Sequence, residues 1–156
     1  MNKNSSLILK AGLLVGTLDI LAAFINFYSK TGKNVSIVLK YIASAVFGKE
    51  AMTGGNSMIF LGLLFHYLIA FGFTLIFALL YPKLWQWFKN ISLIAIVYGV
   101  FIWLIMNLIV VPSSKASQIP FSWSAGTVNW LILIICIGLP LAYLFRKNDM
   151  ANSVKN

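Results

Sequence analysis

Four long apolar stretches dominate the chain. Crossing the hydrocarbon core of a bilayer takes about 20 helical residues, and each stretch is about that long. The stretches do not alternate apolar and polar positions, and the chain is too short for a closed membrane barrel. Helices satisfy their own backbone hydrogen bonds in lipid. The pattern therefore predicts an all-α polytopic membrane protein, a single membrane domain over residues 1–156, with transmembrane helices at about 8–28, 57–80, 91–111 and 127–145.

A shorter apolar segment, residues 35–47, lies between the first two stretches. At roughly 20 Å of helix it is too short to span a bilayer. Lys40 shares one helical stripe with two serines, so the segment is amphipathic. We expect a short interfacial helix at about 35–47, with Lys40 toward water and with Tyr41, Ile42 and Phe47 toward acyl chains or the bundle.

Prolines and charged residues punctuate the apolar stretches. The linker 81–90, "YPKLWQWFKN", is predicted to separate the second and third spans at Pro82. Pro112 is predicted to end the third span, and "RKND" at 146–149 to stop the fourth. Pro140 lies inside the fourth stretch, where we expect it to kink the helix rather than end it.

Composition agrees with a lipid-solvated protein. Sixty per cent of the 156 residues are apolar, 10 % are charged, and the mean hydropathy is +0.90, whereas an ordinary soluble domain has about a quarter charged residues. The net charge of +9 comes from basic residues that stand singly beside apolar stretches rather than in a patch. This distribution favours the lipid bilayer as the partner and argues against nucleic acid.

The distribution of lysine and arginine gives an orientation. Lys10 and Asp19 interrupt the first apolar run and no convincing cleavage site follows, so we interpret it as a retained span rather than a signal peptide. With the N-terminus inside, seven basic residues are inner: Lys3, Lys10, Lys83, Lys89, Arg146, Lys147 and Lys155. Five are outer: Lys30, Lys33, Lys40, Lys49 and Lys115. The bias predicts that both termini are cytoplasmic.

One acidic residue, Asp19, stands within the first span. Steps of four and three residues place it on one stripe with small and polar residues: Gly12, Gly16, Ala23 and Asn26. Gly12 and Gly16 form a GxxxG pair, which lets another helix approach closely. The stripe predicts that Asp19 faces protein rather than lipid.

The only histidine, His66, lies in the second span on a ridge with Gly62, Ala70 and Thr74. Asp19 and His66 are each nine residues from the outer end of their spans. Both therefore lie roughly 13 Å below the outer surface, near the middle of the hydrocarbon core. Because the two helices are sequential and antiparallel, we expect the two side chains to approach within hydrogen-bonding distance, directly or through one water.

The Asp19/His66 pair has two interpretations. An aspartate at a helix centre costs about 2.5–3.5 kcal/mol on insertion scales, so it needs a proton or a partner. The pair could respond to protons, because imidazole ordinarily changes charge near neutral pH. It could also be a polar clasp that only fixes helix packing. Secondary candidates for contact with Asp19 are Asn26, Tyr98 and Asn107.

The residue inventory argues against most enzyme chemistry. There is one histidine and one cysteine, Cys136, so zinc sites and bis-histidine haem lack ligands. The other acids, Glu50 and Asp149, lie outside the predicted spans, and no G-x-S-x-G frame is present. We predict no catalytic, cofactor-binding or metal-binding residues. The alternative to a non-catalytic protein is a channel or proton-coupled carrier for a small molecule or ion, acting as a homo-oligomer because four helices leave little room for a pore.

The layout resembles the YagU-like inner-membrane proteins, a family of small four-helix proteins. The resemblance rests on the glycine-marked first span, the histidine in the second, "YPKLW" at 81–85 and "VVP" at 110–112. The polar insert of the family's first loop is shorter here. The resemblance implies a bacterial inner-membrane location and a part in acid tolerance, and it supplies no catalytic residues.

Overall fold

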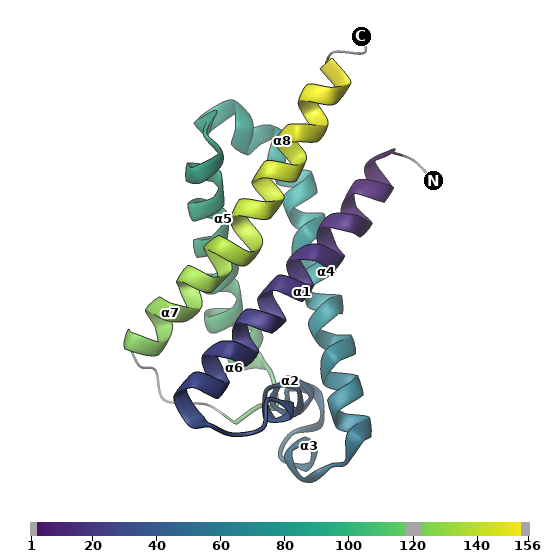
Figure 1. Cartoon of the computed structure of the whole chain (residues 1–156), viewed down its shortest axis with the longest axis vertical. Helices are drawn as coiled ribbons and strands as arrows, with labels where there is room; N and C mark the ends of the chain where they lie inside the picture. The colour runs from purple at the N-terminus through teal and green to yellow at the C-terminus, as the bar shows by residue number, and fades with distance from the viewer. Residues whose placement is uncertain (1–2, 118–122, 154–156) are drawn as a thin grey trace.

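The computed structural model describes the backbone of residues 3–117 and 123–153 (Figure 1). All the regular secondary structure of these residues is helical. The elements are α1 (Lys3–Thr31), α2 (Ser36–Phe47), α3 (Glu50–Thr53), α4 (Asn56–Phe88), α5 (Ile91–Ile105), the π-helix η1 (Met106–Val110), α6 (Val111–Ser113), α7 (Trp123–Leu133), the π-helix η2 (Ile134–Gly138) and α8 (Leu139–Ser153).

Four helices are long and apolar enough to cross a membrane, as the sequence predicts. Their outward faces carry large apolar side chains: Leu79 is 74 % exposed and Ile25 is 68 % exposed. Such surfaces would be costly in water, so lipid must solvate them. The four spans are Ser5–Thr31, Asn56–Phe88, Ile91–Ser113 and Gly126–Ser153.

Two predicted helix ends are wrong. The second span does not end near residue 80: α4 continues through Pro82 to Phe88. A proline removes one backbone hydrogen bond, which a long packed helix tolerates. The stop comes at Lys89, whose φ of 46° is left-handed, and Asn90 then caps the next helix. Likewise "RKND" does not stop the fourth span, and α8 runs to Ser153, because charged residues end the lipid-facing surface without breaking a helix.

The third and fourth spans each contain a π-helical segment. In the third span η1 precedes Pro112, and the helix ends at Ser113, one residue beyond the predicted stop. In the fourth span η2 ends at Gly138, two residues before Pro140, and the helix continues through the proline as predicted. A π-segment rearranges the hydrogen-bond ladder locally instead of breaking it.

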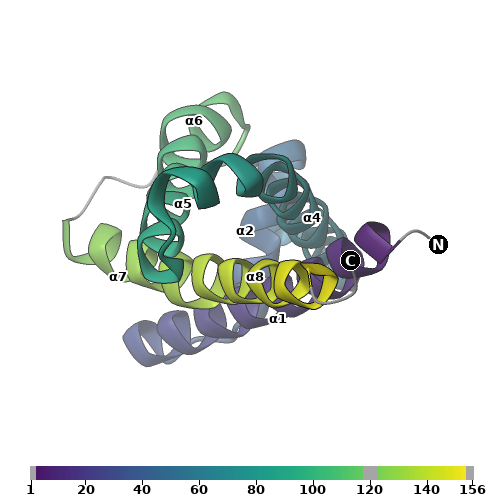
Figure 2. The same ribbon diagram turned by 90° about the horizontal axis from the view of Figure 1, so that it is seen from above.

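The four spans form one bundle with the start of α1 and the end of α8 at the same end (Figures 1 and 2). The short helices α2, α3 and α6 lie at the opposite end. The predicted short helix at 35–47 is confirmed as α2. Gly48, with φ of 66°, closes it.

Helix α2 packs closely against α4. A methyl group added at Gly62 would collide with the backbone of Leu39, so the two helices meet where α4 has no side chain. Ser44 is 2 % exposed and donates to the Tyr41 carbonyl at 2.6 Å. Phe47 stacks on the Phe65 ring. One side of α2 is therefore held by the bundle.

The half of the bundle nearer the termini is filled by large side chains. Tyr98 and Phe145 each pack edge-on against Phe77, and all three are buried. A methyl group at Gly99 would lie 3.0 Å from the Ile134 backbone, and one at Gly138 would collide with the Ala95 carbonyl. These glycines let the third and fourth spans cross closely and seal this half.

Candidate functional site

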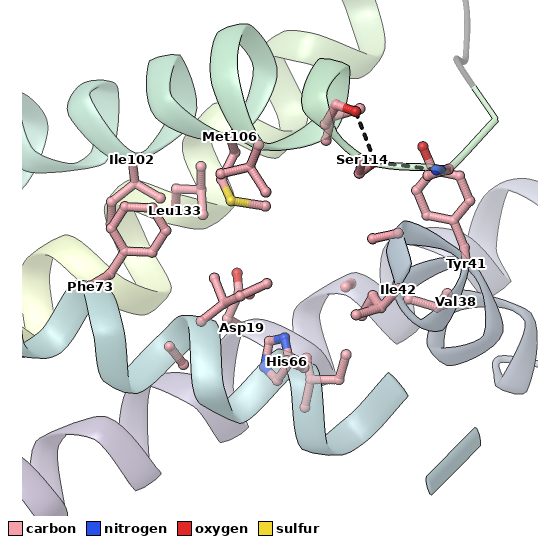
Figure 3. Close-up of a pocket in the computed structure, with 18 of the residues that line it drawn as sticks. Asp19, Val38, Tyr41, Ile42, His66, Phe73, Ile102, Met106, Ser114 and Leu133 are labelled. Carbon is pink, nitrogen blue, oxygen red and sulfur yellow. Dashed lines mark hydrogen bonds between the residues drawn. The ribbon is translucent and has the colours of Figure 1, made fainter. Parts of the chain in front are cut away.

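The other half of the bundle, beneath α2, contains two adjoining cavities, of which Figure 3 shows the inner one. The inner cavity has a volume of about 220 Å³ and extends among α1, α4, α5 and η2. The outer cavity, of about 650 Å³, lies toward α2 and α3. Both are lined mainly by apolar side chains, and they share Asp19, Tyr41 and Met106. The shared residues place the two cavities side by side.

Asp19 faces this space, as its stripe on α1 predicts. It lines both cavities together with Ala23, and Asn26 of the same stripe lines the outer one. The two glycines of the stripe face α4 instead. A methyl group at Gly16 would lie 2.9 Å from the Tyr67 ring, and one at Gly12 would collide with the Phe71 ring.

His66 is buried on α4 and is held by the backbone of α1. Its Nε2 atom lies 2.8 Å from the carbonyl oxygen of Gly16. A carbonyl oxygen only accepts, so Nε2 carries the hydrogen and donates it. Gly16 has no side chain, which lets Tyr67 and Ala70 of α4 approach α1 closely at this point.

The structure brings Asp19 and His66 to the same cavity but not into a direct hydrogen bond. Both line the inner cavity, and Figure 3 draws them on the side opposite Met106. Among the described residues, the Asp19 carboxylate makes no hydrogen bond and no ion pair within 4 Å, although it interacts electrostatically with His66. A contact through one water stays a prediction.

The three secondary candidates differ in position. Asn26 and Asn107 line the outer cavity with Asp19, and the Asn107 Nδ2 donates to the Trp103 carbonyl one turn back at 2.8 Å. Tyr98 lines neither cavity, and its hydroxyl donates to the Phe73 carbonyl. Tyr98 is therefore not a partner for Asp19, because its donor is already used in the sealed half.

Tyr41 brings α2 into the site: of the two surroundings that the sequence allows, acyl chains or the bundle, it faces the bundle. Its hydroxyl donates to the Ser117 carbonyl at 3.3 Å. Burial raises the pKa of the Tyr41 phenol, so the group stays neutral and remains a donor at physiological pH. Ile42 lies beside it on the same cavity wall.

Sequence reasoning missed several lining residues. Met106 and Val110 belong to η1 and Ile137 to η2, and all three line the inner cavity. No pattern in an apolar run predicts a π-segment. Asn129 was a usable signal, because it is an amide inside the fourth apolar stretch, and it lines the outer cavity.

The site has little capacity for metal binding. Among residues 5–117 and 126–153, no three histidine, cysteine or acidic side chains cluster. Cys136 is a free thiol within electrostatic reach of Asp19. What the cavity offers is one carboxylate, one imidazole and several neutral donors in an apolar enclosure. This arrangement suits binding or proton exchange better than group transfer.

Comparison with known proteins finds no relative of this chain. No family model matches the sequence, no curated protein matches it, and no solved structure matches the fold.

Proposed function

We propose that this multi-pass protein is a non-catalytic inner-membrane protein that takes up and releases protons at Asp19 and His66. Its likeness in layout to the YagU-like proteins supports a role in acid or proton stress. An intramembrane ionisable residue is expensive to keep and usually marks a functional site.

One observation carries the proposal: the Asp19 carboxylate and His66 share a cavity in which the carboxylate has no hydrogen-bond partner among the described side chains. The clasp between the first two spans is provided by His66 and the Gly16 carbonyl, without Asp19. A purely structural role therefore leaves the carboxylate unexplained. A proton, exchanged through the outer cavity, satisfies it.

Infrared titration of the protein in lipid nanodiscs tests proton uptake. The chain has only three acidic side chains, Asp19, Glu50 and Asp149, so the carboxylic-acid C=O region is simple to assign. We expect one titrating band to disappear in Asp19→Asn and to persist in the matched control Glu50→Gln. We also expect its midpoint to move in His66→Gln. Identical spectra for wild type and Asp19→Asn would overturn the proposal.

A second candidate is a proton-coupled carrier or channel acting as a homo-oligomer. It is favoured by the outer cavity, which connects the α2 end of the bundle with Asp19. In proteoliposomes with an entrapped pH dye, this candidate requires proton or solute flux that Asp19→Asn abolishes and Glu50→Gln retains. Proton binding without flux would support the non-catalytic proton-binding function and exclude the carrier or channel.

The proposed orientation places both termini in the cytoplasm, and hence α2 at the periplasmic surface. Reporter fusions after Asn90 and Asn156 should report inside, and a fusion after Ser117 should report outside. The inverted pattern would place the cavity mouth on the cytoplasmic side.

A further inference from the structure

The unpartnered carboxylate indicates what the cavity binds besides a proton. Among the residues that the structure describes, no lysine or arginine lines either cavity, and Asp19 is the only acidic residue that does. The other titratable groups near it are His66 of α4, Tyr41 of α2 and Cys136 of η2. The His66 Nε2 hydrogen is used by Gly16. Among the described lining residues, His66 is the only group that can become cationic beside the carboxylate, so a permanently charged partner comes from outside these residues.

We propose that the cavity binds a small monovalent organic cation with an apolar body, its ammonium group against the Asp19 carboxylate. The inference rests on the proposed function because it uses the same carboxylate. A proton and the organic cation then compete for one site.

The cavity walls match the two parts of such a molecule. Phe73, Ile102 and Leu133 line the inner cavity and offer apolar contact to a hydrocarbon body. The outer cavity, at about 650 Å³, falls in the range that small molecules occupy, and the inner cavity adds about 220 Å³ beside it. Tyr41 and Phe73 add aromatic rings, which attract cations through their faces. A carboxylate in an otherwise apolar site is the usual way to orient such a ligand.

The outer cavity carries several neutral polar groups among its mainly apolar walls. The outer cavity is lined by two amides of the spans, Asn26 and Asn107, by Asn129 of α7, and by Ser44 of α2. These groups can replace water around an ammonium group as it enters. The nearby lysines Lys33, Lys49 and Lys115 are exposed and line neither cavity, so solvent screens their repulsion.

The π-segments supply an independent observation. Both η1 and η2 contribute residues to the cavity wall, namely Met106 and Ile137. Short π-segments inside α-helices occur often at functional sites, where they widen a turn and re-aim side chains. Their presence on two helices facing one cavity fits a wall shaped for a ligand rather than for helix packing.

Equilibrium dialysis against protein in zwitterionic nanodiscs tests the proposal. The probe is benzyltrimethylammonium, whose charge does not titrate, and its neutral isostere is neopentylbenzene. We expect saturable binding of the cation that is about tenfold weaker, or more, in Asp19→Asn and unchanged in Glu50→Gln. The neutral isostere should bind wild type and Asp19→Asn equally. Equal binding of the cation by the two proteins overturns the proposal.

A second variant tests the cavity without removing the charge. Ala23→Leu places extra volume where both cavities meet, and the matched control Ala22→Leu adds the same volume at a neighbouring position that lines neither. We expect Ala23→Leu to abolish cation binding and Ala22→Leu to retain it. Retained binding in Ala23→Leu would place the probe elsewhere and overturn the assigned site.

The pH dependence separates the two proposals. Because protonation removes the Asp19 charge, the affinity for the cation should fall as the pH falls. Conversely, adding the cation should keep Asp19 ionised and so reduce the infrared band of the protonated acid. A titrating Asp19 band without cation binding would overturn the proposed cation site and support the proposed proton function. Cation binding that does not change with pH, with no titrating Asp19 band, would support the ligand and overturn the proton function.

Discussion

The imidazole Nε2 of His66 lies 2.8 Å from the carbonyl oxygen of Gly16, and this contact joins the first two spans. The sequence predicts that histidine would hold aspartate. Instead it holds the backbone carbonyl of Gly16, where α1 and α4 lie close together. The two residues therefore have different roles. His66 stabilises the α1–α4 interface, and Asp19, three residues after Gly16 on α1, lines the cavity.

Replacing His66 should weaken the bundle according to whether the new side chain can donate. His66→Leu removes the hydrogen bond to Gly16, and we expect the free energy of unfolding to fall by about 0.6 kcal/mol, the average for polar contacts between membrane helices. His66→Gln keeps an N–H donor and should lose less. Reversible unfolding in mixed micelles measures both. Equal losses would mean that the hydrogen bond does not stabilise the interface.

Replacing Asp19 should stabilise the protein rather than weaken it. The sequence alone predicts that Asp19→Ala destabilises more than Asp19→Asn by leaving His66 unpaired, but the Gly16 carbonyl already pairs it. Removing a carboxylate from an apolar cavity relieves its desolvation cost, so we expect both variants to gain about 1 kcal/mol in the same unfolding assay.

A double-mutant cycle between Asp19 and His66 checks the remaining coupling. Because the two side chains interact through space without a direct bond, the coupling should be no more than about 0.5 kcal/mol. A coupling several times larger would indicate the water-mediated contact.

The number and approximate positions of the four spans could be predicted from the lengths of the apolar stretches. The buried face of a helix could be predicted from its stripe of small residues. The ridge of Gly62, His66, Ala70 and Thr74 is buried as one face. The detailed contacts do not follow, because a backbone carbonyl has no signature in sequence. Whether His66 donates to Asp19 or to the Gly16 carbonyl depends on how α4 crosses α1.

Helix ends and cavities were the least predictable features. Pro82 and "RKND" are typical of linkers, yet packing and the polar ends of the membrane tolerate both within helices. The cavity depends on α2 crossing the end of the bundle at Gly62 and on the two π-segments. These are tertiary relations between elements, and a local pattern carries no information about them.

The close crossing of the third and fourth spans should be sensitive to one methyl group. Gly138→Ala would push its new side chain into the Ala95 carbonyl, which belongs to a helix backbone and cannot move alone. We expect a loss of about 1–3 kcal/mol in unfolding free energy. In the control, Gly72→Ala, a methyl group meets nothing within 4 Å, and stability should be unchanged or raised. Similar behaviour of the two variants would contradict the crossing.

The last prediction concerns the side of the membrane on which α2 lies. Lys33 precedes α2 and Lys49 follows it, and both are exposed. Because α2 is 12 residues long and does not cross, single cysteines at the two positions, in a Cys136→Ala background, should both react with an impermeant maleimide added to intact cells. Lys83→Cys, near the opposite end of α4, should react only after permeabilisation. Labelling of the Lys33 and Lys49 sites from opposite sides would make α2 a fifth span, place the termini on different sides and remove the cavity mouth.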